Sequence, residues 1–338
     1  MIAHSADLTL IWAGVIAFAV AAYVVLDGFD LGLGILFPFF PEKHDRDVVM
    51  NTVAPVWDGN ETWLVLGGGG LFAAFPMAFA ILMPALYLPV FAMLLALVFR
   101  GVAFEFRWRS RRRAHWWDAS FILGSIIAAF FQGVILGAIL QGVAVDGRGY
   151  GGGAFDWCTG FSILTGIALV IGYGLLGATW LVMKTGGALQ AHARRLARPF
   201  AIATLFFIVA LSAATPALEP GYYQRWLSMP NLIFTAPVPI AVAAVVLLLF
   251  RSLARGRDEV RPFLLALALF GLCFLGLGIS IFPYVVPVRV TIWEAAAPAI
   301  SQAFMLAGTV VLVPLILAYT GYAYWVFRGK VEPGQGYH

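Results

Sequence analysis

The chain has 338 residues, of which 62% are hydrophobic and 11% are charged, and its formal net charge is +4. A soluble domain carries roughly a quarter charged residues, so this composition excludes a soluble fold and predicts an all-α membrane protein that crosses the bilayer many times. The basic residues lie mainly in connecting segments and are not interleaved with aromatic residues, which argues against a nucleic-acid-binding surface.

Nine segments are apolar and long enough to cross a bilayer, which takes about 20 residues. They form one transmembrane domain over residues 1–338, and the odd number suggests two four-helix bundles plus one helix, although no internal repeat supports that division. The first segment has neither a basic stretch before it nor a cleavage pattern after it, so we expect no signal peptide. In chain order the segments cover residues 8–26, 57–75, 78–99, 119–140, 160–183, 200–217, 236–250, 263–286 and 299–327.

Basic residues predict the orientation of these spans. They concentrate in every second connection, beginning with residues 43–46, whereas the intervening connections carry only Arg148, Arg225 and Arg289. Because basic loops stay in the cytoplasm, nine spans place the N-terminus outside and the C-terminus inside. This scheme assigns Arg100 to a cytoplasmic loop.

Glycines and prolines within the spans predict how the helices pack and where they end. The many glycines indicate close approach of helix backbones in lipid. Prolines such as Pro76, Pro84, Pro89 and Pro283 predict helix ends or kinks.

The second span reaches full length only if it includes the polar residues before Trp63. The uncharged run from Trp63 to Val98 has about 36 residues, whereas two spans and a turn need roughly 42 or more. One long helix is the alternative, but three prolines interrupt the run. We therefore expect Asp58 and Glu61 to lie in or at the edge of the hydrocarbon, near the cytoplasmic face.

Asp27 and Asp30 lie at the cytoplasmic end of the first span. Together with the two acids of the second span they place four carboxylates at one depth, with almost no basic residue in the same helices. Burial and mutual repulsion both disfavour the charged form. We therefore expect a proton-uptake site formed by Asp58, Asp30, Asp27 and Glu61, with Asp58 as the best single candidate. The alternative is structural, because Asp58 lies in the first turn of its helix and Asp27-Gly28 resembles a helix stop. The first helix can also continue past Asp30 to Pro38, because residues 31–37 are apolar.

Two tryptophans beside these acids are candidates for contact with a ligand. Tryptophan at this depth is normally an interface residue, as we also expect for Trp293. The other interpretation is that Trp57, Trp63 and Asn60 contact a quinone or a partner subunit.

Three other polar side chains have structural interpretations. Glu105 lies among arginines, and we expect it to be paired or solvated. Gln132 and Gln141 are expected to form hydrogen bonds between helices.

The histidines argue against a redox metal held by this chain, because such metals in membrane cores are usually ligated by histidine. The two cysteines are isolated and are expected to pack as small apolar groups. All five histidines lie in terminal or connecting segments: His4, His44, His115, His192 and His338.

Several sequence blocks extend from the first expected span to the ninth. They are DGFDLGLG (27–34), APVWDGNETWL (54–64), LFAAFP (71–76), FRGVAFEFR (99–107), LQG (140–142), IFPY (281–284) and TIWEA (291–295). Together these blocks are highly specific, and they resemble subunit II of the cytochrome bd ubiquinol oxidases.

The resemblance implies an enzyme of the bacterial inner membrane that oxidises quinol and reduces dioxygen to water. A larger homologous subunit I is expected to hold two haems b and one haem d, and this chain to be haem-free and to pack against it with pseudo-twofold symmetry. Small single-helix accessory subunits and a structural quinone also occur in the family. Asp58 matches the position associated with proton entrance from the cytoplasm, and Asp30 matches another family acid.

Further implications follow from the resemblance. Cytoplasmic proton uptake, with release of quinol protons outside, would generate a proton-motive force without pumping. The short loops are similar to those of the cyanide-insensitive branch, and Glu294 stands where aspartate is common.

Two other functions stay open from the residues. Interrupted helices with buried acids also occur in stand-alone, proton-coupled secondary transporters. In a passive structural subunit, the acids would only cap helices.

Overall fold

The computed structural model describes residues 2–110 and 113–331 of the chain. Among these residues, eight helices are long and apolar enough to cross a membrane. They are α1 (Ile2–Leu36), α5 (Tyr87–Arg109), α6 (Ala114–Gln141), α7 (Gly160–Lys184), α8 (Gly187–Leu218), α11 (Pro237–Arg255), α12 (Arg261–Ile281) and α14 (Ala299–Val326).

Shorter elements connect these helices. The helical ones are η1 (Phe37–Phe39), α2 (Lys43–Asn51), α3 (Trp57–Ala74), α4 (Pro76–Ala85), α9 (Pro220–Leu227), α10 (Asn231–Thr235) and α13 (Ile292–Ala295). Two antiparallel hairpins pair β1 (Val145–Asp146) with β2 (Gly149–Tyr150), and β3 (Tyr284–Val286) with β4 (Val290–Thr291).

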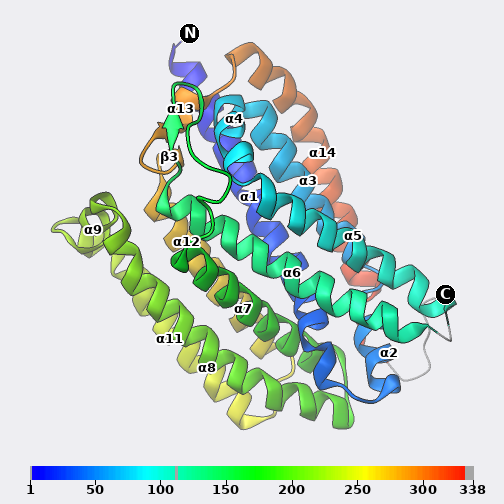
Figure 1. Ribbon diagram of the computed structural model, residues 1–338. Coiled ribbons are helices and arrows are strands. Elements are labelled where there is room, and N and C mark those ends of the chain that lie inside the picture. The colour runs from blue at the N-terminus through cyan, green and yellow to red at the C-terminus, as the bar shows by residue number, and fades with distance from the viewer. Residues whose placement is uncertain (1, 111–112, 332–338) are drawn as a thin grey trace.

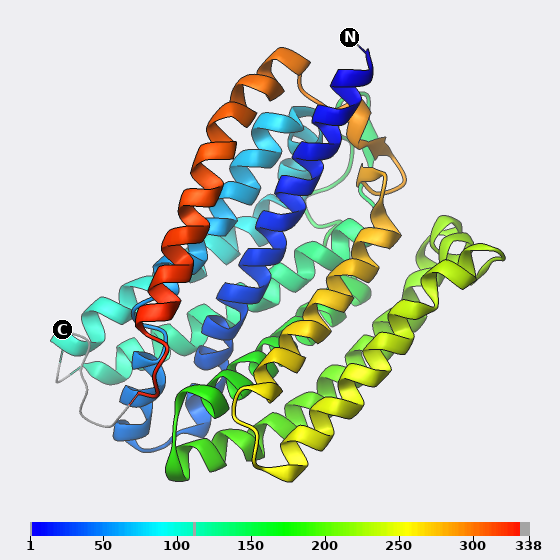
Figure 2. The same ribbon diagram turned by 180° about the vertical axis from the view of Figure 1, so that it is seen from behind.

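Helix α1 runs through the middle of the molecule (Figures 1 and 2). Helices α3, α5 and α14 lie on one side of it, and α8, α11 and α12 lie on the other. The N-terminus, β3 and α13 lie near one end of the molecule, and α2 and the last turn of α14 lie near the other (Figure 1). Polar side chains on α1 are therefore surrounded by protein from both sides.

The first expected span, 8–26, was too short. Helix α1 continues through Gly28 without a break, so the interpretation of Asp27-Gly28 as a helix stop was wrong. Residues 31–36 are apolar and buried, which favours a longer helix, and α1 gives way to a 3₁₀ turn that contains Pro38. This extension brings Asp27 and Asp30 into the protein interior.

Prolines explain two further corrections. The expected span 78–99 is divided at Leu86 between α4 and α5, where Pro84 and Pro89 flank the break. The expected span 263–286 ends at Ile281, because the chain turns at Pro283 into the β3–β4 hairpin.

Charged segments account for the remaining differences. Helix α8 begins at Gly187 rather than at residue 200, because the arginine-rich stretch before residue 200 continues the helix beyond its apolar part. The segment 43–46, expected to be a loop, is the first part of α2.

Glycines allow α1 and α7 to meet backbone to backbone. A Cβ atom added at Gly32 would lie 2.0 Å from the carbonyl oxygen of Tyr173, and one added at Gly177 would lie 2.5 Å from the carbonyl carbon of Gly32. No larger residue fits either position without separating the helices.

We expect Gly32→Ala to lower the thermal stability of the protein in detergent, because overpacking a close contact costs about 1–3 kcal/mol. Gly14→Ala on the same helix is the matched control, because nothing lies within 4 Å of its added Cβ. Equal unfolding midpoints for the two variants would contradict the importance of this contact.

Candidate functional site

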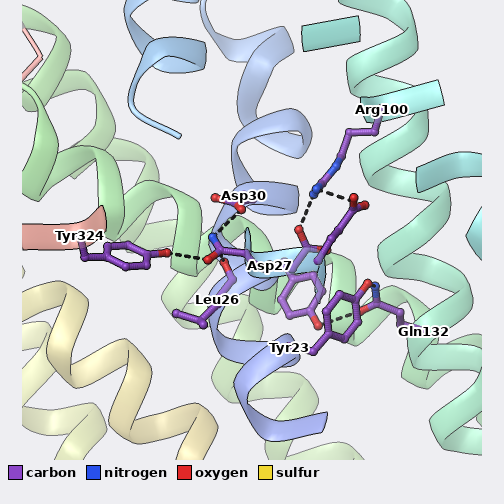
Figure 3. A network of polar contacts seen from close by, with 10 residues as sticks. Tyr23, Leu26, Asp27, Asp30, Arg100, Gln132 and Tyr324 are labelled. Atoms are coloured by element: carbon purple, nitrogen blue, oxygen red, sulfur yellow. Dashed lines mark hydrogen bonds and ion pairs between the residues drawn. The ribbon is translucent and has the colours of Figure 1, made fainter. Parts of the chain in front are cut away.

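Three polar side chains on one face of α1 form the centre of a buried network (Figure 3). Tyr23, Asp27 and Asp30 are spaced four and three residues apart, which places them on the same side of the helix. Tyr23 is 4% exposed, and both aspartates are fully buried. The other members of the network come from α3, α5, α6, α7 and α14.

The first branch is an ion-pair triad. Arg100 of α5 is fully buried, and its Nη1 lies 2.6 Å from Oδ1 of Asp27. Its Nη2 lies 3.3 Å from Oε1 of Glu61 on α3. The guanidinium also lies 5.9 Å from the centroid of Trp57, a cation–π contact. One arginine thus serves two carboxylates.

This position corrects the assignment of Arg100 to a cytoplasmic loop. Helix α5 continues to Arg109, so Arg100 lies more than two turns before its end. The acids indeed lack basic residues in their own helices, but a third helix supplies one.

The second branch joins α1 to α14 through α3. The Nδ2 atom of Asn60 donates to Oδ2 of Asp30 over 2.8 Å and to the carbonyl oxygen of Leu26 over 3.3 Å. The hydroxyl of Tyr324 donates to Oδ1 of Asn60 over 2.9 Å. Asn60 is fully buried and fixes the orientation of the Asp30 carboxyl group.

The third branch runs into α6 and α7. The Nε2 atom of Gln132 donates to the hydroxyl oxygen of Tyr23 over 2.5 Å, and Tyr173 donates to Oε1 of Gln132 over 2.8 Å. The expected interhelical role of Gln132 is confirmed. Gln141 is also bonded to another helix, since its Oε1 accepts from Thr159 at the start of α7.

Asp58 lies outside these bonds. It is in the first turn of α3, one turn before Glu61, and its side chain is exposed on the surface of this chain. Within the described residues its carboxylate forms no hydrogen bond or ion pair. The structure thus brings Asp27, Asp30 and Glu61 together, and it places Asp58 at the adjoining surface.

The candidate contact residues differ in accessibility. Trp63 is 1% exposed and packs edge-on against Phe18, and Asn60 is enclosed by its three hydrogen bonds. Trp57 is half-buried and stacks on Phe104, with ring centroids 4.8 Å apart. Of the three, only Trp57 presents an appreciable part of its side chain to the surface.

A second ion cluster near α2 provides a contrast. Arg107 pairs with Asp118 over 2.5 Å and with Asp47 over 2.7 Å, and Arg46 pairs with Asp118 over 3.1 Å. Arginines and aspartates are equal in number here. In the network around α1, the described residues provide three carboxyl groups and one guanidinium, which contacts only two of them.

Sequence reasoning found the acids but missed Tyr23, Arg100, Tyr173 and Tyr324. The four-residue spacing of Tyr23 and Asp27 was a usable signal. The others come from distant helices, and their sequence neighbours give no sign of this contact.

Metal-ligating side chains do not cluster in residues 2–110 and 113–331: no group of three or more histidines, cysteines or acids could hold an ion there. His192, for example, lies within hydrogen-bonding distance of the carbonyl oxygen of Phe39 and of Arg195. The expected pairing of Glu105 is confirmed by a 3.3 Å contact with Arg109, and both side chains are exposed.

Comparison with known proteins gives consistent matches. Residues 8–327 match the family model of cytochrome bd terminal oxidase subunit II. The chain is 30% identical to cytochrome bd-I ubiquinol oxidase subunit 2 of Escherichia coli, over 96% of this chain and 95% of the relative. It is 29% identical to cytochrome bd ubiquinol oxidase subunit 2 of Bacillus subtilis, over 97% and 98%.

A solved structure has the same fold. A chain of the bd oxidase from Geobacillus thermodenitrificans superposes with a TM-score of 0.73, at 18% identity, over 93% of this chain and 97% of that one. At this identity the likeness shows the fold alone.

Proposed function

Because the chain belongs to the cytochrome bd terminal oxidase subunit II family, we propose that it scaffolds the haem-bearing subunit I and carries part of the proton-uptake route. Family membership makes it a multi-pass protein of the bacterial inner membrane and part of an oxidoreductase complex. The two haems b and the haem d are assigned to subunit I, where they would carry out quinol oxidation and oxygen reduction.

The imbalance of charge around α1 is the observation that carries the proposal. If all three carboxyl groups were ionised, one guanidinium could not compensate them. An uncompensated charge inside a membrane protein is costly, so the network favours retention of at least one proton. A site that holds a proton and exchanges it is what a proton route needs.

The route that we propose begins at the surface with Asp58. Glu61 lies one turn further along α3, and Arg100 connects it to Asp27. Arginine keeps its proton, so Arg100 acts as a counter-ion while carboxyl groups exchange protons. Two buried carboxyl oxygens have no hydrogen-bond partner among the described residues, and polar sites of this kind favour bound water: Asp27 Oδ2 and Asp30 Oδ1.

We propose that α3 is a ninth membrane pass. Its first two turns include Asp58, Asn60 and Glu61, which keep it from matching the apolar composition of the other eight helices. Nine passes keep the N-terminus outside and put the basic ends of α5, α7, α11 and α14 in the cytoplasm. The division into two four-helix bundles plus one helix stays a prediction.

The exposed face of α3 supports the position of subunit I. Asp58, Thr62, Val65 and Phe72 recur at helical spacing along this face, and all four are exposed. A carboxylate there would face lipid unless a partner covered it. We propose that subunit I covers this exposed face of α3. We also propose that Trp57 contacts a structural quinone. Small accessory subunits stay an expectation from the family.

The transporter hypothesis has no support from the relatives, which are oxidase subunits. Electrogenic turnover follows if protons enter from the cytoplasm while quinol protons leave on the other side. The Asp58→Asn variant separates the passive structural role from the proton route.

We expect Asp58→Asn to lower oxygen consumption by the purified complex about tenfold or more, because an amide cannot relay a proton. Haem spectra and co-purification of both subunits should stay unchanged. Glu105→Gln is the matched control, since that acid is exposed and paired with Arg109. Unchanged turnover in Asp58→Asn would refute its role, and loss of assembly would favour the passive role.

A further inference from the structure

The third branch of the network is not used by the proposed route. Tyr173, Gln132 and Tyr23 form a continuous hydrogen-bonded chain across α7, α6 and α1, and Figure 3 labels the last two of these residues. A chain of this kind could either conduct protons or hold a charge in place. Its two ends decide between these roles.

The far end is closed. Tyr173 is fully buried, and its ring stacks on Phe270 with centroids 5.9 Å apart. A Cβ added at Gly28 would lie 2.7 Å from the Tyr173 ring, so α1 packs directly on it. Among the described residues, the Tyr173 hydroxyl bonds only to Gln132, so it ends the chain beside an apolar helix contact.

The near end is directed at Asp27. The oxygen of Tyr23 accepts from Gln132, which leaves the hydroxyl proton of Tyr23 for another acceptor. Tyr23 lies one helical turn before Asp27 on the same face of α1, and Oδ2 of Asp27 has no hydrogen-bond partner among the described residues, so this oxygen is available to the Tyr23 hydroxyl group. Every donor in the chain thus points from Tyr173 towards Asp27.

Donors that point at a carboxyl group stabilise its anionic form. Asp27 has two such contributions, the Tyr23 chain and the 2.6 Å contact with Arg100. Asp30 differs, because its donor is the neutral amide of Asn60 and Arg100 forms no bond to it. The two aspartates of α1 are therefore in unlike environments although they are one turn apart.

We propose that Tyr173, Gln132 and Tyr23 are positioning residues that hold Asp27 as a permanent anion beside Arg100, so that Asp30 and Glu61 carry the exchangeable proton. This inference rests on the proposed proton route and names which of its acids change protonation. It also assigns the third branch as a dead end for protons. Among the described residues, the titratable or charged groups near Asp27 and its neighbour Asp30 are Tyr23, Glu61, Arg100, Tyr173 and Tyr324.

The test is the pH dependence of oxygen consumption by the purified two-subunit complex. Tyr23→Phe removes the donor to Asp27, and Gln132→Leu disconnects the chain while keeping both rings. In each variant we expect the acid limb of the profile to move to higher pH, by up to about one pH unit, because one buried hydrogen bond changes an equilibrium about two- to tenfold. Tyr173→Phe should move it less, since it is one bond further away.

Tyr222→Phe is the matched control. This tyrosine is also buried, and its hydroxyl donates to the carbonyl oxygen of Leu140, which is not a member of the network. Its profile should coincide with that of the unsubstituted complex. If Tyr23→Phe does not yield a haem-loaded complex, Gln132→Leu provides the same test.

Two results would overturn the inference. The first is a Tyr23→Phe or Gln132→Leu profile that coincides with that of Tyr222→Phe. The second is equal loss of turnover at every pH in Tyr23→Phe and Tyr173→Phe, as a conducting chain would give. Asp30→Asn separates failure of the proton route from failure of the role given to the hydrogen-bonded chain. Full turnover in Asp30→Asn refutes the proton route itself. Lost turnover in Asp30→Asn, together with unshifted pH profiles in the tyrosine variants, refutes only the role of the chain.

Discussion

Replacing Arg100 with methionine is expected to prevent recovery of a stable complex, or to lower its stability by about 3–5 kcal/mol. The guanidinium is fully buried and is the cation bonded to both Asp27 and Glu61. Its removal leaves two carboxyl groups at membrane depth without a positive partner. The yield and thermal midpoint of the haem-loaded complex measure the effect.

A double substitution makes this prediction specific. Asp27→Asn in the Arg100→Met background should recover part of the lost stability, because it removes a charge that the single variant leaves unpaired. Arg109→Met is the matched control, since its pair with Glu105 is exposed and contributes little. Equal midpoints for Arg100→Met and Arg109→Met would contradict the importance of the buried triad.

Asp30→Asn is expected to lower oxygen consumption about a hundredfold while the haem content stays unchanged. The amide has nearly the same shape as the carboxyl group and can keep the contact with Asn60, but it cannot take up and release a proton. Proton uptake during a single turnover, followed with a pH indicator, should fall together with oxygen consumption.

Two variants on the same branch control for this effect. Asp30→Glu keeps an acid and should retain more turnover than Asp30→Asn. Tyr324→Phe keeps Asp30 itself and removes only the hydroxyl that donates to Asn60. If turnover is higher in Asp30→Asn than in Tyr324→Phe, the Asp30 side chain orients the network and does not carry protons.

The sequence allowed the acids to be predicted but not their counter-charge. Asp27, Asp30 and Glu61 stood out because a carboxylate at membrane depth is rare whatever surrounds it. Arg100 was assigned to a loop, because hydropathy cannot show how far a helix continues past its apolar part. Its partners lie 73 and 39 residues away in sequence, so only the fold shows the pairing.

Helix ends followed the same pattern. Proline marked the break between α4 and α5 and the end of α12, but the expected spans were drawn through both. Gly28 misled in the opposite direction, since a glycine that resembles a helix stop is there to accommodate the ring of Tyr173. The local sequence shows that a glycine or proline is present, but whether it ends a helix depends on the packing of the neighbouring helix.

The backbone contact between Gly32 and Gly177 has a consequence for coupling. A membrane that stores energy as a proton gradient must not leak, and a buried acid is a risk if water can reach it from both sides. Where a carbonyl group of α7 already touches α1, no file of water molecules can pass between the two helices on that flank of Asp30. The glycine pair therefore insulates the acid on the side of α7.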